Sequence, residues 1–431
     1  MIKEIRLQHW KSFEDATLYI DPLTVLIGSN ASGKSNALDA LVFLQRISLN
    51  NLDTQTALGG NEIIEPIRGG INWAVMKSHN QFQISVTQIF ENLEFKLSDQ
   101  KTLEITNTFY IYLQDAPTML GDHYSWVSNY KIKDEWQKKT QSLIISLENK
   151  DCFSSLDYVN LYSKIIEYRN SNSLKKIDNN ILHDFELLSK LLVENDGDSL
   201  SFKELQKFFI FNPIPSKMRH YSRFSRKLLP DASNLAGFLA ALSEQHKTEI
   251  EQALSKYLNH LPEKDIRKVW AEPVGRLGSD AMLYCEEEWI EGKTQIIDAH
   301  SMSDGTLRFL AILTALLTRP EGSLLVIEEI DNGLHPSRMK LLIQAMREIG
   351  SQRKIDILVT THNPALLDGL EPEMMPFVQV VHRDPKTGTS KITPLDELDN
   401  LPKLMASGSL GTITTSGDLE QSLKIQEAEH G

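Results

Sequence analysis

Eight residues near the N-terminus have the composition and order of a phosphate-binding loop. The stretch GSNASGKS, residues 28–35, matches the pattern G-x-x-x-x-G-K-[ST]. The apolar run LTVLI precedes it, and KSNALDALVFLQ follows with leucines at helical spacing. Glycines in such a strand–loop–helix arrangement let backbone amides face an anion at the positive end of the helix. The predicted chemistry is the binding of nucleotide phosphates.

The pattern predicts roles for the last two residues of the loop. We expect Lys34 to lie against the β- and γ-phosphates and Ser35 to place its hydroxyl on Mg²⁺. A Gly/Ser turn with a chance lysine is the alternative, and the flanking strand and helix favour the phosphate loop. The candidate nucleotide contacts in and beside the loop are Gly28, Asn30, Ser32, Gly33, Lys34, Ser35 and Asn36.

A second stretch, SLLVIEEIDNGLHP, residues 323–336, ends an apolar run in carboxylates. Four consecutive aliphatic residues predict a short buried strand. Carboxylates at its end cost desolvation free energy unless a cation meets them. A strand that simply leaves the core for a polar turn is one interpretation. The phosphate loop favours another, in which Glu328 orients magnesium-bound water and Glu329 polarises the water that attacks the γ-phosphate.

Two weaker motifs complete the pattern. SMSDGTLRFL, residues 301–310, opens an expected helix, and VTTHNP, residues 359–364, ends an expected strand. Taken alone, the first is more typical of a helix N-cap followed by a turn, and the second of a structural histidine. The order along the chain is more specific: phosphate loop, SDG helix, Glu-Glu strand, then the Thr-Thr-His strand end.

The elements that position these motifs indicate an α/β fold. After residue 233, helical patterns alternate with buried strands, which predicts a parallel sheet covered by helices. The first hundred residues are rich in strand patterns, so the whole sheet is expected to be mixed. Between residues 122 and 198 the chain is rich in Lys, Asn and Ser, with apolar residues at helical spacing. We therefore predict an N-terminal lobe at 1–121, a helical insertion at 122–200 and a C-terminal lobe at 201–431.

Composition limits the remaining functions. The net charge of −13, from 45 basic and 58 acidic residues, argues against a generally basic nucleic-acid-binding surface. SKMRHYSRFSRK, residues 216–227, is a local exception. It is either a phosphate-backbone contact or a solvated loop paired with the acidic surplus. Two cysteines, no signal-peptide core and no membrane-length apolar run predict a cytoplasmic protein.

The ordered motifs resemble the ATP-binding-cassette ATPases of the SMC/RecF type. They are most similar to the stand-alone, OLD-like AAA-family ATPases of bacterial phage-defence and genome-maintenance operons. SDGTLRF resembles the signature motif, LLVIEEIDNGLHP the Walker B strand with its D-loop, and VTTHNP the switch-histidine motif. QHWKSFED is similar to the N-F-[KR]-S-F element, whose Lys11 and Ser12 positions touch nucleotide in relatives. The resemblance covers residues 1 to about 100 and 205–420.

This resemblance implies an ABC-type head and a mechanism. Two heads would close face to face around ATP, with Ser303 and Gly305 reaching the γ-phosphate bound by the other subunit. His362 would reach the same phosphate from its own subunit, and Glu329 would be catalytic. A homodimer or higher even oligomer follows. The Q-loop glutamine stays open among Gln81, Gln83 and Gln88.

The resemblance also implies a role. The sequence offers no metal-nuclease constellation, and about 70 residues after His362 are too few for a TOPRIM domain. We therefore expect a separate nuclease or toxin as effector, with this chain as its ATP-dependent sensor in antiphage defence. The main alternative is a RecF-like DNA-binding ATPase of DNA repair. A transporter subunit and a scaffold with a degenerate site are disfavoured.

Overall fold

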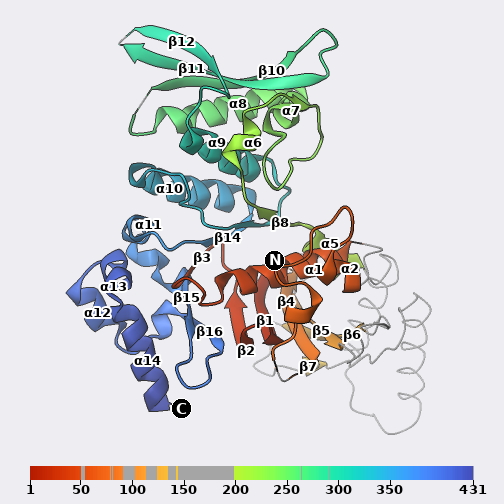
Figure 1. Ribbon diagram of the computed structural model, residues 1–431, viewed down its shortest axis with the longest axis vertical. Coiled ribbons are helices and arrows are strands. Elements are labelled where there is room, and N and C mark those ends of the chain that lie inside the picture. The colour runs from red at the N-terminus through yellow and green to blue at the C-terminus, as the bar shows by residue number, and fades with distance from the viewer. Residues whose placement is uncertain are drawn as a thin grey trace. The chain divides into compact units, whose positions relative to one another are not determined.

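The structure is a computed structural model that describes residues 1–49, 54–77, 79, 81–90, 102–112, 124–133, 142–143, 199–263, 265–290 and 292–430. The chain divides into two compact units (Figure 1). Unit 1 contains Met1–Thr17 and Asp39–Lys207, and unit 2 contains Leu18–Leu38 and Phe208–Gly431. The phosphate loop and the three later motifs all lie in unit 2.

The sheet of unit 2 is mostly parallel, in the order β16-β15-β3-β14-β13-β8. β8, β13, β14, β3 and β15 run parallel, and β16 is antiparallel to β15. Every residue of β3, β13 and β14 is buried, as continuous apolar runs predict. The strands are β3 (Leu23–Ile27), β8 (Phe208–Phe211), β13 (Leu324–Ile327), β14 (Asp356–Thr360), β15 (Val378–Arg383) and β16 (Ser390–Pro394).

Parallel pairing explains why the phosphate loop belongs to unit 2. β3 lies between β14 and β15, so its carboxyl end meets theirs at one edge of the sheet. Ligands of open α/β sheets bind at this edge. The helices that follow or precede these strands are α1 (Lys34–Ser48), α9 (Asp304–Thr318), α10 (Pro336–Arg353) and α11 (Pro364–Asp368). The prediction of an α/β fold with a mixed sheet and a phosphate loop is confirmed.

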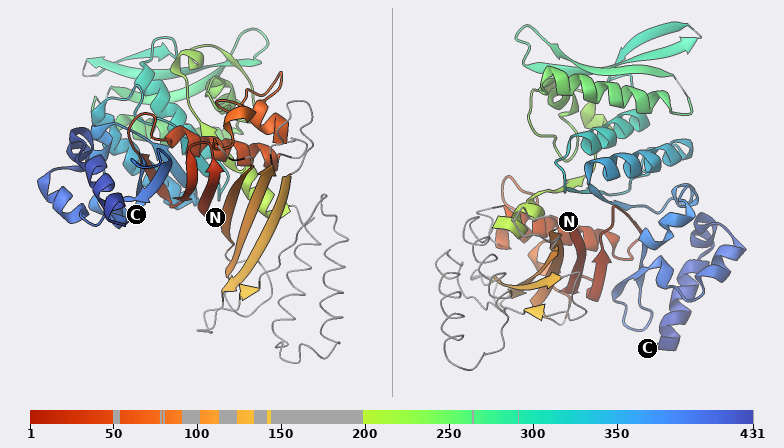
Figure 2. Two further views of the ribbon diagram at one scale, coloured as in Figure 1. Left: turned by 60° about the horizontal axis from the view of Figure 1, so that its bottom comes forward. Right: turned by 180° about the vertical axis from the view of Figure 1, so that it is seen from behind.

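A second, antiparallel sheet in unit 2 has no counterpart in the sequence predictions. Its order is β10-β11-β12, with β9 also paired to β11. α8 packs on β10, and α7 packs on β10 and β11, so these helices cover one face (Figure 2). The elements are β9 (Ser222–Arg223), β10 (Ile266–Val274), β11 (Asp280–Ile290), β12 (Lys293–Asp298), α6 (Pro215–Met218), α7 (Leu235–Ala240) and α8 (Glu244–Asn259).

The C-terminal part of unit 2 is helical. α13 packs on α11, the short helix that follows the switch-histidine segment. The elements are α12 (Leu401–Ser407), α13 (Leu410–Ser416), α14 (Asp418–His430) and the 3₁₀ turns η2 (Pro372–Phe377) and η3 (Leu395–Glu397). No helix in the described part of the chain is long and apolar enough to cross a membrane.

Unit 1 contains an antiparallel sheet in the order β7-β6-β5-β4-β1-β2. Three aromatic rings from different elements meet in its core: Trp10, Phe43 and Phe82, with centroids 4.8 to 5.8 Å apart. The elements are β1 (Ile2–Trp10), β2 (Phe13–Tyr19), β4 (Gln81–Phe90), β5 (Thr102–Tyr112), β6 (Tyr124–Lys133), β7 (Ser142–Leu143), α2 (Thr54–Gly59), α5 (Ser199–Gln206) and η1 (Ile71–Trp73).

The predicted helical insertion at 122–200 is wrong at its start. β6 pairs with β5 along its whole length, and β7 pairs with β6. The stretch YSWVSNYKIK is rich in aromatic and β-branched residues, which favour a strand once a neighbouring strand offers its edge. The two stretches with clear helical spacing, at 156–168 and 181–195, lie outside the described residues.

Candidate nucleotide-binding site

The backbone of the phosphate loop is unusual at three positions. Gly28, Ala31 and Gly33 have positive φ angles of 147°, 63° and 125°. A Cβ atom on Gly28 would lie 2.2 Å from the carbonyl oxygen of Val381, so only glycine fits there. Backbone that curls in this way brings successive N–H groups together around an anion. The loop therefore has the form that the G-x-x-x-x-G-K-S pattern predicts.

Two side chains from the β15–β16 hairpin hold the loop. Arg383 donates to the carbonyl oxygen of Ala31 through Nε at 3.2 Å and Nη2 at 3.1 Å. The hydroxyl of Ser390 donates to the carbonyl oxygen of Ser32 at 2.5 Å. All three bonds are accepted by backbone carbonyl oxygens of the loop. Neither Arg383 nor Ser390 was among the residues predicted from sequence.

Ser32 provides a direct test of whether the loop fits a phosphate. Its side chain is buried, and its Oγ has no hydrogen-bond partner among the described residues. A buried hydroxyl without a partner costs free energy of about 1–3 kcal/mol. An acceptor oxygen placed in the loop would recover it. The orphaned hydroxyl thus fits a phosphate-binding site.

Lys34 lies over the loop that precedes it. Its Nζ donates to the carbonyl oxygens of Gly28 at 2.5 Å and Ser29 at 2.9 Å. Burial lowers the pKa of Lys34, and the nearby carboxylates of Glu329 and Glu328 partly offset this effect. The ammonium group therefore interacts electrostatically with Glu329, the predicted catalytic carboxylate, and with Glu328, the predicted magnesium ligand.

Ser35 and Glu328 meet directly. The hydroxyl of Ser35 donates to Oε1 of Glu328 at 2.9 Å. A hydroxyl and a carboxylate oxygen are hard ligands of the kind that Mg²⁺ prefers, and Mg²⁺ in phosphate sites usually takes few protein ligands because it keeps several waters. The donor set that the structure brings together at the carboxyl ends of β3 and β13 fits this ion.

The backbone of Glu329 is held in a strained conformation. Its φ is 47°, in the left-handed region, which costs a non-glycine residue about 1–3 kcal/mol. The N–H of Glu329 donates to Oγ1 of Thr360 at 2.9 Å. Nη2 of Arg308 donates to the carbonyl oxygens of Glu329 at 2.9 Å and Glu328 at 3.1 Å. These bonds hold the backbone that carries the exposed Glu329 side chain.

Arg308 connects the signature helix to this carboxylate pair. It lies on α9, it is 3% exposed, and its Nη1 donates to the carbonyl oxygen of Pro213 at 2.9 Å. Burial lowers the pKa of Arg308, and the charges of Asp331 and Glu329 partly offset it. Three backbone carbonyls therefore depend on one buried guanidinium group.

The D-loop and the switch-histidine segment are joined by side-chain and backbone bonds. Oγ1 of Thr361 donates to Oδ1 of Asp331 at 2.6 Å, and the N–H of Ile330 donates to the carbonyl oxygen of Thr360 at 3.1 Å. His362 follows directly and is exposed. Asn363 then caps α11 by accepting from the N–H of Ala365. His362 is thus held at the same sheet edge as Glu329.

The signature residues lie at the N-terminus of α9. Ser303 is the N-cap, and its Oγ accepts from the N–H of Thr306 at 3.1 Å. A Cβ atom on Gly305 would lie 2.9 Å from the carbonyl oxygen of Gly333 in the D-loop. Gly305 therefore has a packing requirement of its own, independent of any ligand. The exposed Ser303 remains the candidate for contact with another molecule.

Lys11, of unit 1, has an intramolecular partner. Its Nζ donates to Oδ2 of Asp39 at 2.6 Å and to the carbonyl oxygen of Arg68 at 2.7 Å. Burial lowers the pKa of Lys11, and the bond to Asp39 partly offsets it. Nucleotide contact by Lys11 and Ser12 stays a prediction. The three Q-loop candidates all lie on β4, and the choice among them stays open.

Comparison with known proteins places the chain in a family. A family model described as "AAA domain, putative AbiEii toxin, Type IV TA system" matches residues 23–102 and 156–368, which include the phosphate loop, Glu328, Glu329 and His362. The chain belongs to this AAA-domain family. The predicted relationship to AAA-type ATPases is confirmed.

Individual relatives of this AAA domain are distant. A Helicobacter pylori protein named "ATP/GTP phosphatase" is 22% identical over 397 residues, which cover 86% of this chain and 88% of that protein. A structure of an "SmcHead bound to the C-winged helix domain of ScpA" gives a TM-score of 0.49 at 13% identity, covering 91% of this chain and 97% of that one. The "SMC head domain from Thermotoga maritima" gives 0.42 at 12% identity, covering 91% and 98%.

Proposed function

We propose that this AAA domain binds ATP with Mg²⁺ and hydrolyses it to ADP and phosphate. The observation that carries the proposal is the contact between Ser35 and Glu328, which unites the loop and the carboxylate strand at 2.9 Å. Lys34 lies at the same place, with its pKa influenced by both Glu328 and Glu329. A turn with a purely structural role does not need Lys34, Ser35 and Glu328 at one place. Phosphoryl transfer needs all three kinds of group there.

Each residue has a chemical task in this proposal. Glu329 accepts the proton of a water molecule while the water oxygen attacks the γ-phosphorus of ATP. The bond from that phosphorus to the bridging oxygen breaks, and ADP leaves with the electron pair. Lys34 and the loop amides stabilise the charge on the phosphate oxygens. Mg²⁺ held by Ser35, with Glu328 orienting its water, would neutralise charge on the β- and γ-phosphates.

The proposal includes an ATP-dependent homodimer. Ser303 is exposed at the N-terminus of α9, where N–H groups favour an anion. Within the described part of the chain, its hydroxyl bonds to the N–H and the hydroxyl of Thr306 in α9, and its position suits a contact with the γ-phosphate of a second copy. On a two-fold axis each copy supplies both halves of two such sites. ATP then stabilises the closed dimer, and hydrolysis releases it.

The last part of the proposal is a separate effector protein as partner. The family description names a toxin of a type IV toxin–antitoxin system, which supports a place in bacterial defence. In this role the chain senses a phage-derived trigger and its dimer controls a separate nuclease or toxin. The neighbouring gene product, co-expressed and co-purified, is the partner to examine.

The mass in solution of the Glu329→Gln variant tests ATP binding and dimerisation together. With Mg-ATP the mass should double, because nucleotide is bound but not hydrolysed. Adding Ser303→Arg to this variant should abolish the doubling. As a control in the wild-type chain, Glu321→Gln breaks an exposed ion pair with Lys354 and should leave ATP turnover unchanged. An unchanged mass, with ATP bound at full occupancy, would contradict the dimer and leave ATP binding in place.

A second candidate, DNA binding, rests on the loop at 216–227. Arg226 and Lys227 are exposed, and Tyr221 is 62% exposed. Lys217 and Arg219, by contrast, form ion pairs with Asp231 and Asp304 of the same chain. We therefore assign any phosphate-backbone contact to Arg226 and Lys227. DNA-stimulated ATPase activity without a partner protein, lost in Arg226→Glu/Lys227→Glu, would favour this function.

A further inference from the structure

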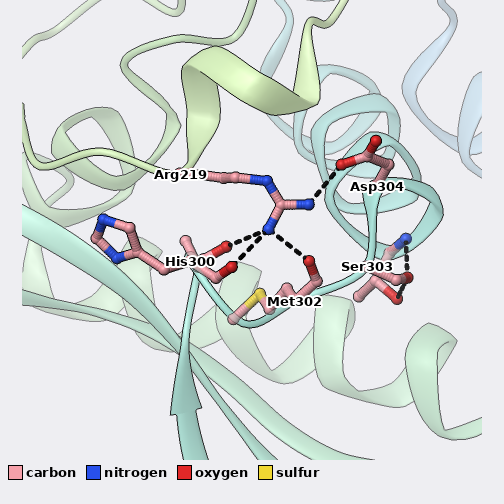
Figure 3. Close-up of polar contacts among 7 residues, drawn as sticks. Arg219, His300, Met302, Ser303 and Asp304 are labelled. Carbon is pink, nitrogen blue, oxygen red and sulfur yellow. Dashed lines mark hydrogen bonds and ion pairs between the residues drawn. The ribbon is translucent and has the colours of Figure 1, made fainter.

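Arg219 forms the centre of a hydrogen-bond network around the segment that precedes the signature helix (Figure 3). Its Nη1 donates to the carbonyl oxygens of Ala299 at 3.1 Å, His300 at 2.7 Å and Met302 at 2.7 Å. Its Nη2 donates to Oδ1 of Asp304 at 2.5 Å. One side chain thus binds three of the five residues of the turn 299–303 and the first residue of α9.

Other bonds hold the first part of this turn. The N–H of Ala299 donates to the carbonyl oxygen of Leu283 at 2.9 Å, and the N–H of His300 donates to Oδ1 of Asp298 at 3.1 Å. Residues 299–303 connect β12 to α9 and have no regular secondary structure. The N–H of Ser301 donates to the carbonyl oxygen of Asp298, and Met302 is buried beneath the turn. A planar guanidinium group has five donors in a fixed arrangement, so Arg219 can bind three carbonyls from one nitrogen and a carboxylate from the other. Its bonds to Met302 and Asp304 lie on either side of Ser303, so the path of the backbone into Ser303 depends on Arg219.

We propose that Arg219 is a positioning residue of the signature motif. It holds Ser303 in the conformation in which Ser303 meets the γ-phosphate bound by a second copy of the chain. Arg219 itself touches no nucleotide, and its effect falls on the partner's active site rather than on its own. This inference rests on the face-to-face dimer of the proposed function.

The network is separate from the residues that hold the chain's own catalytic group. Glu329 is held by Arg308 and Thr360, whereas the contacts of Arg219 all lie at residues 299–304. Asp304 is largely exposed, with 64% of its side chain accessible, and the buried part of α9 begins after it, at Thr306. Loss of Arg219 should therefore disorder the signature turn and leave the core of α9 packed.

Mixing variants tests which active site Arg219 serves. Alone, Arg219→Ala should bind a fluorescent ATP analogue as wild type does, and it should hydrolyse ATP at least tenfold more slowly. Mixed with Glu329→Gln, it should regain roughly a quarter of wild-type turnover, because half of randomly paired dimers are mixed and each holds one intact site. Mixed with Ser303→Arg, it should stay inactive, because both chains then lack the signature.

Controls separate this role from a general loss of stability. Arg347→Ala removes an exposed arginine–glutamate pair elsewhere in unit 2, with Glu371, and should leave turnover unchanged. Arg219→Lys keeps the charge but not the fixed set of donors, so it should show the same rescue pattern with a smaller defect. The melting temperature of each variant should stay within a few degrees of wild type.

Three results would overturn the inference. If Ser303→Arg is rescued by Glu329→Gln and Arg219→Ala is not, Arg219 acts on its own subunit. Normal turnover in Arg219→Ala would also overturn the proposed positioning role of Arg219. If Ser303→Arg is not rescued either, the shared active site of the proposed dimer fails, and the role of Arg219 fails with it.

Discussion

The hydroxyl of Ser35 donates a 2.9 Å hydrogen bond to the carboxylate of Glu328, although 293 positions separate the two residues in the chain. The contact exists because β3 and β13 both pair with β14 in parallel, which aligns their carboxyl ends. Ser35 follows β3 and Glu328 follows β13 directly. Sheet topology therefore determines the position of the proposed magnesium ligands.

Replacement of either ligand should weaken magnesium binding specifically. In Ser35→Ala or Glu328→Gln, we expect the Mg²⁺ concentration for half-maximal turnover to rise about tenfold. This corresponds to a loss of roughly 1.4 kcal/mol of binding free energy. The double variant should be little worse than the worse single variant, because the two groups act as a unit. Titration of Mg²⁺ at saturating ATP measures this. Full additivity of the two effects would show that they do not share an ion.

Arg308 should be required for catalysis through the backbone of Glu329. Arg308→Lys leaves buried carbonyl oxygens without donors, so we expect a loss of about 3 kcal/mol of unfolding free energy. We also expect a fall of at least tenfold in kcat with little change in KM, because Glu329 would leave its strained conformation. Denaturant unfolding and steady-state kinetics measure the two effects separately.

Arg319 provides the matched control for Arg308. It is half-buried, and its guanidinium carbon lies 4.4 Å from the centre of the Phe209 ring. Burial lowers the pKa of Arg319 as it does for Arg308. Arg319→Lys should therefore reduce stability by about 1 kcal/mol, the size of a cation–π contact, without a change in kcat. An equal loss of kcat in both variants would contradict a specific role for Arg308.

Replacement of Gly28 and of Gly388 by alanine should separate the effect of a steric clash from that of backbone strain. Both have positive φ, but a Cβ on Gly28 would lie 2.2 Å from a backbone oxygen, and one on Gly388 would meet nothing within 4 Å. Gly388→Ala should cost about 1 kcal/mol of unfolding free energy. Gly28→Ala should cost clearly more and abolish nucleotide binding, as thermal unfolding with and without ATP would show. Equal losses in the two variants would mean that the loop relaxes around the added carbon.

ATP binding should take up a proton through Lys34 at alkaline pH. Burial holds the pKa of Lys34 below its ordinary value of 10.5, and bound phosphates would raise it again. At a pH between the lowered pKa of Lys34 in the free protein and its raised pKa in the ATP complex, Lys34 is deprotonated in the free protein and protonated in the complex. Calorimetry in buffers of different ionisation enthalpy, from neutral pH upward, should show uptake that increases with pH. Lys34→Arg should show none, because arginine stays charged.

The sequence predicted the elements that carry the chemistry because their patterns are local. Continuous apolar runs identified β3, β13 and β14, and the glycine pattern identified the loop between β3 and α1. Arg308 could also have been found, since a charge in the otherwise apolar helix TLRFLAILTALL must have a buried partner.

Other parts of the site had no local signal. Arg383 and Ser390 hold the phosphate loop from more than 350 positions away, and nothing near either residue indicates this contact. β12 was missed for a different reason: most of its residues are exposed, so no alternation of polar and apolar residues marks it as a strand. The start of the insertion was predicted as helix because pairing with β5 is not visible in local spacing.

The position of β3 in its sheet has a consequence for biosynthesis. Every residue of this strand is buried between β14 and β15, yet those neighbours emerge from the ribosome about 330 residues later. At roughly 5–20 residues per second, the apolar strand waits for about 15–65 s without its native partners. During this interval it is a natural substrate for chaperones, and a slowly translated chain would be the more prone to aggregate.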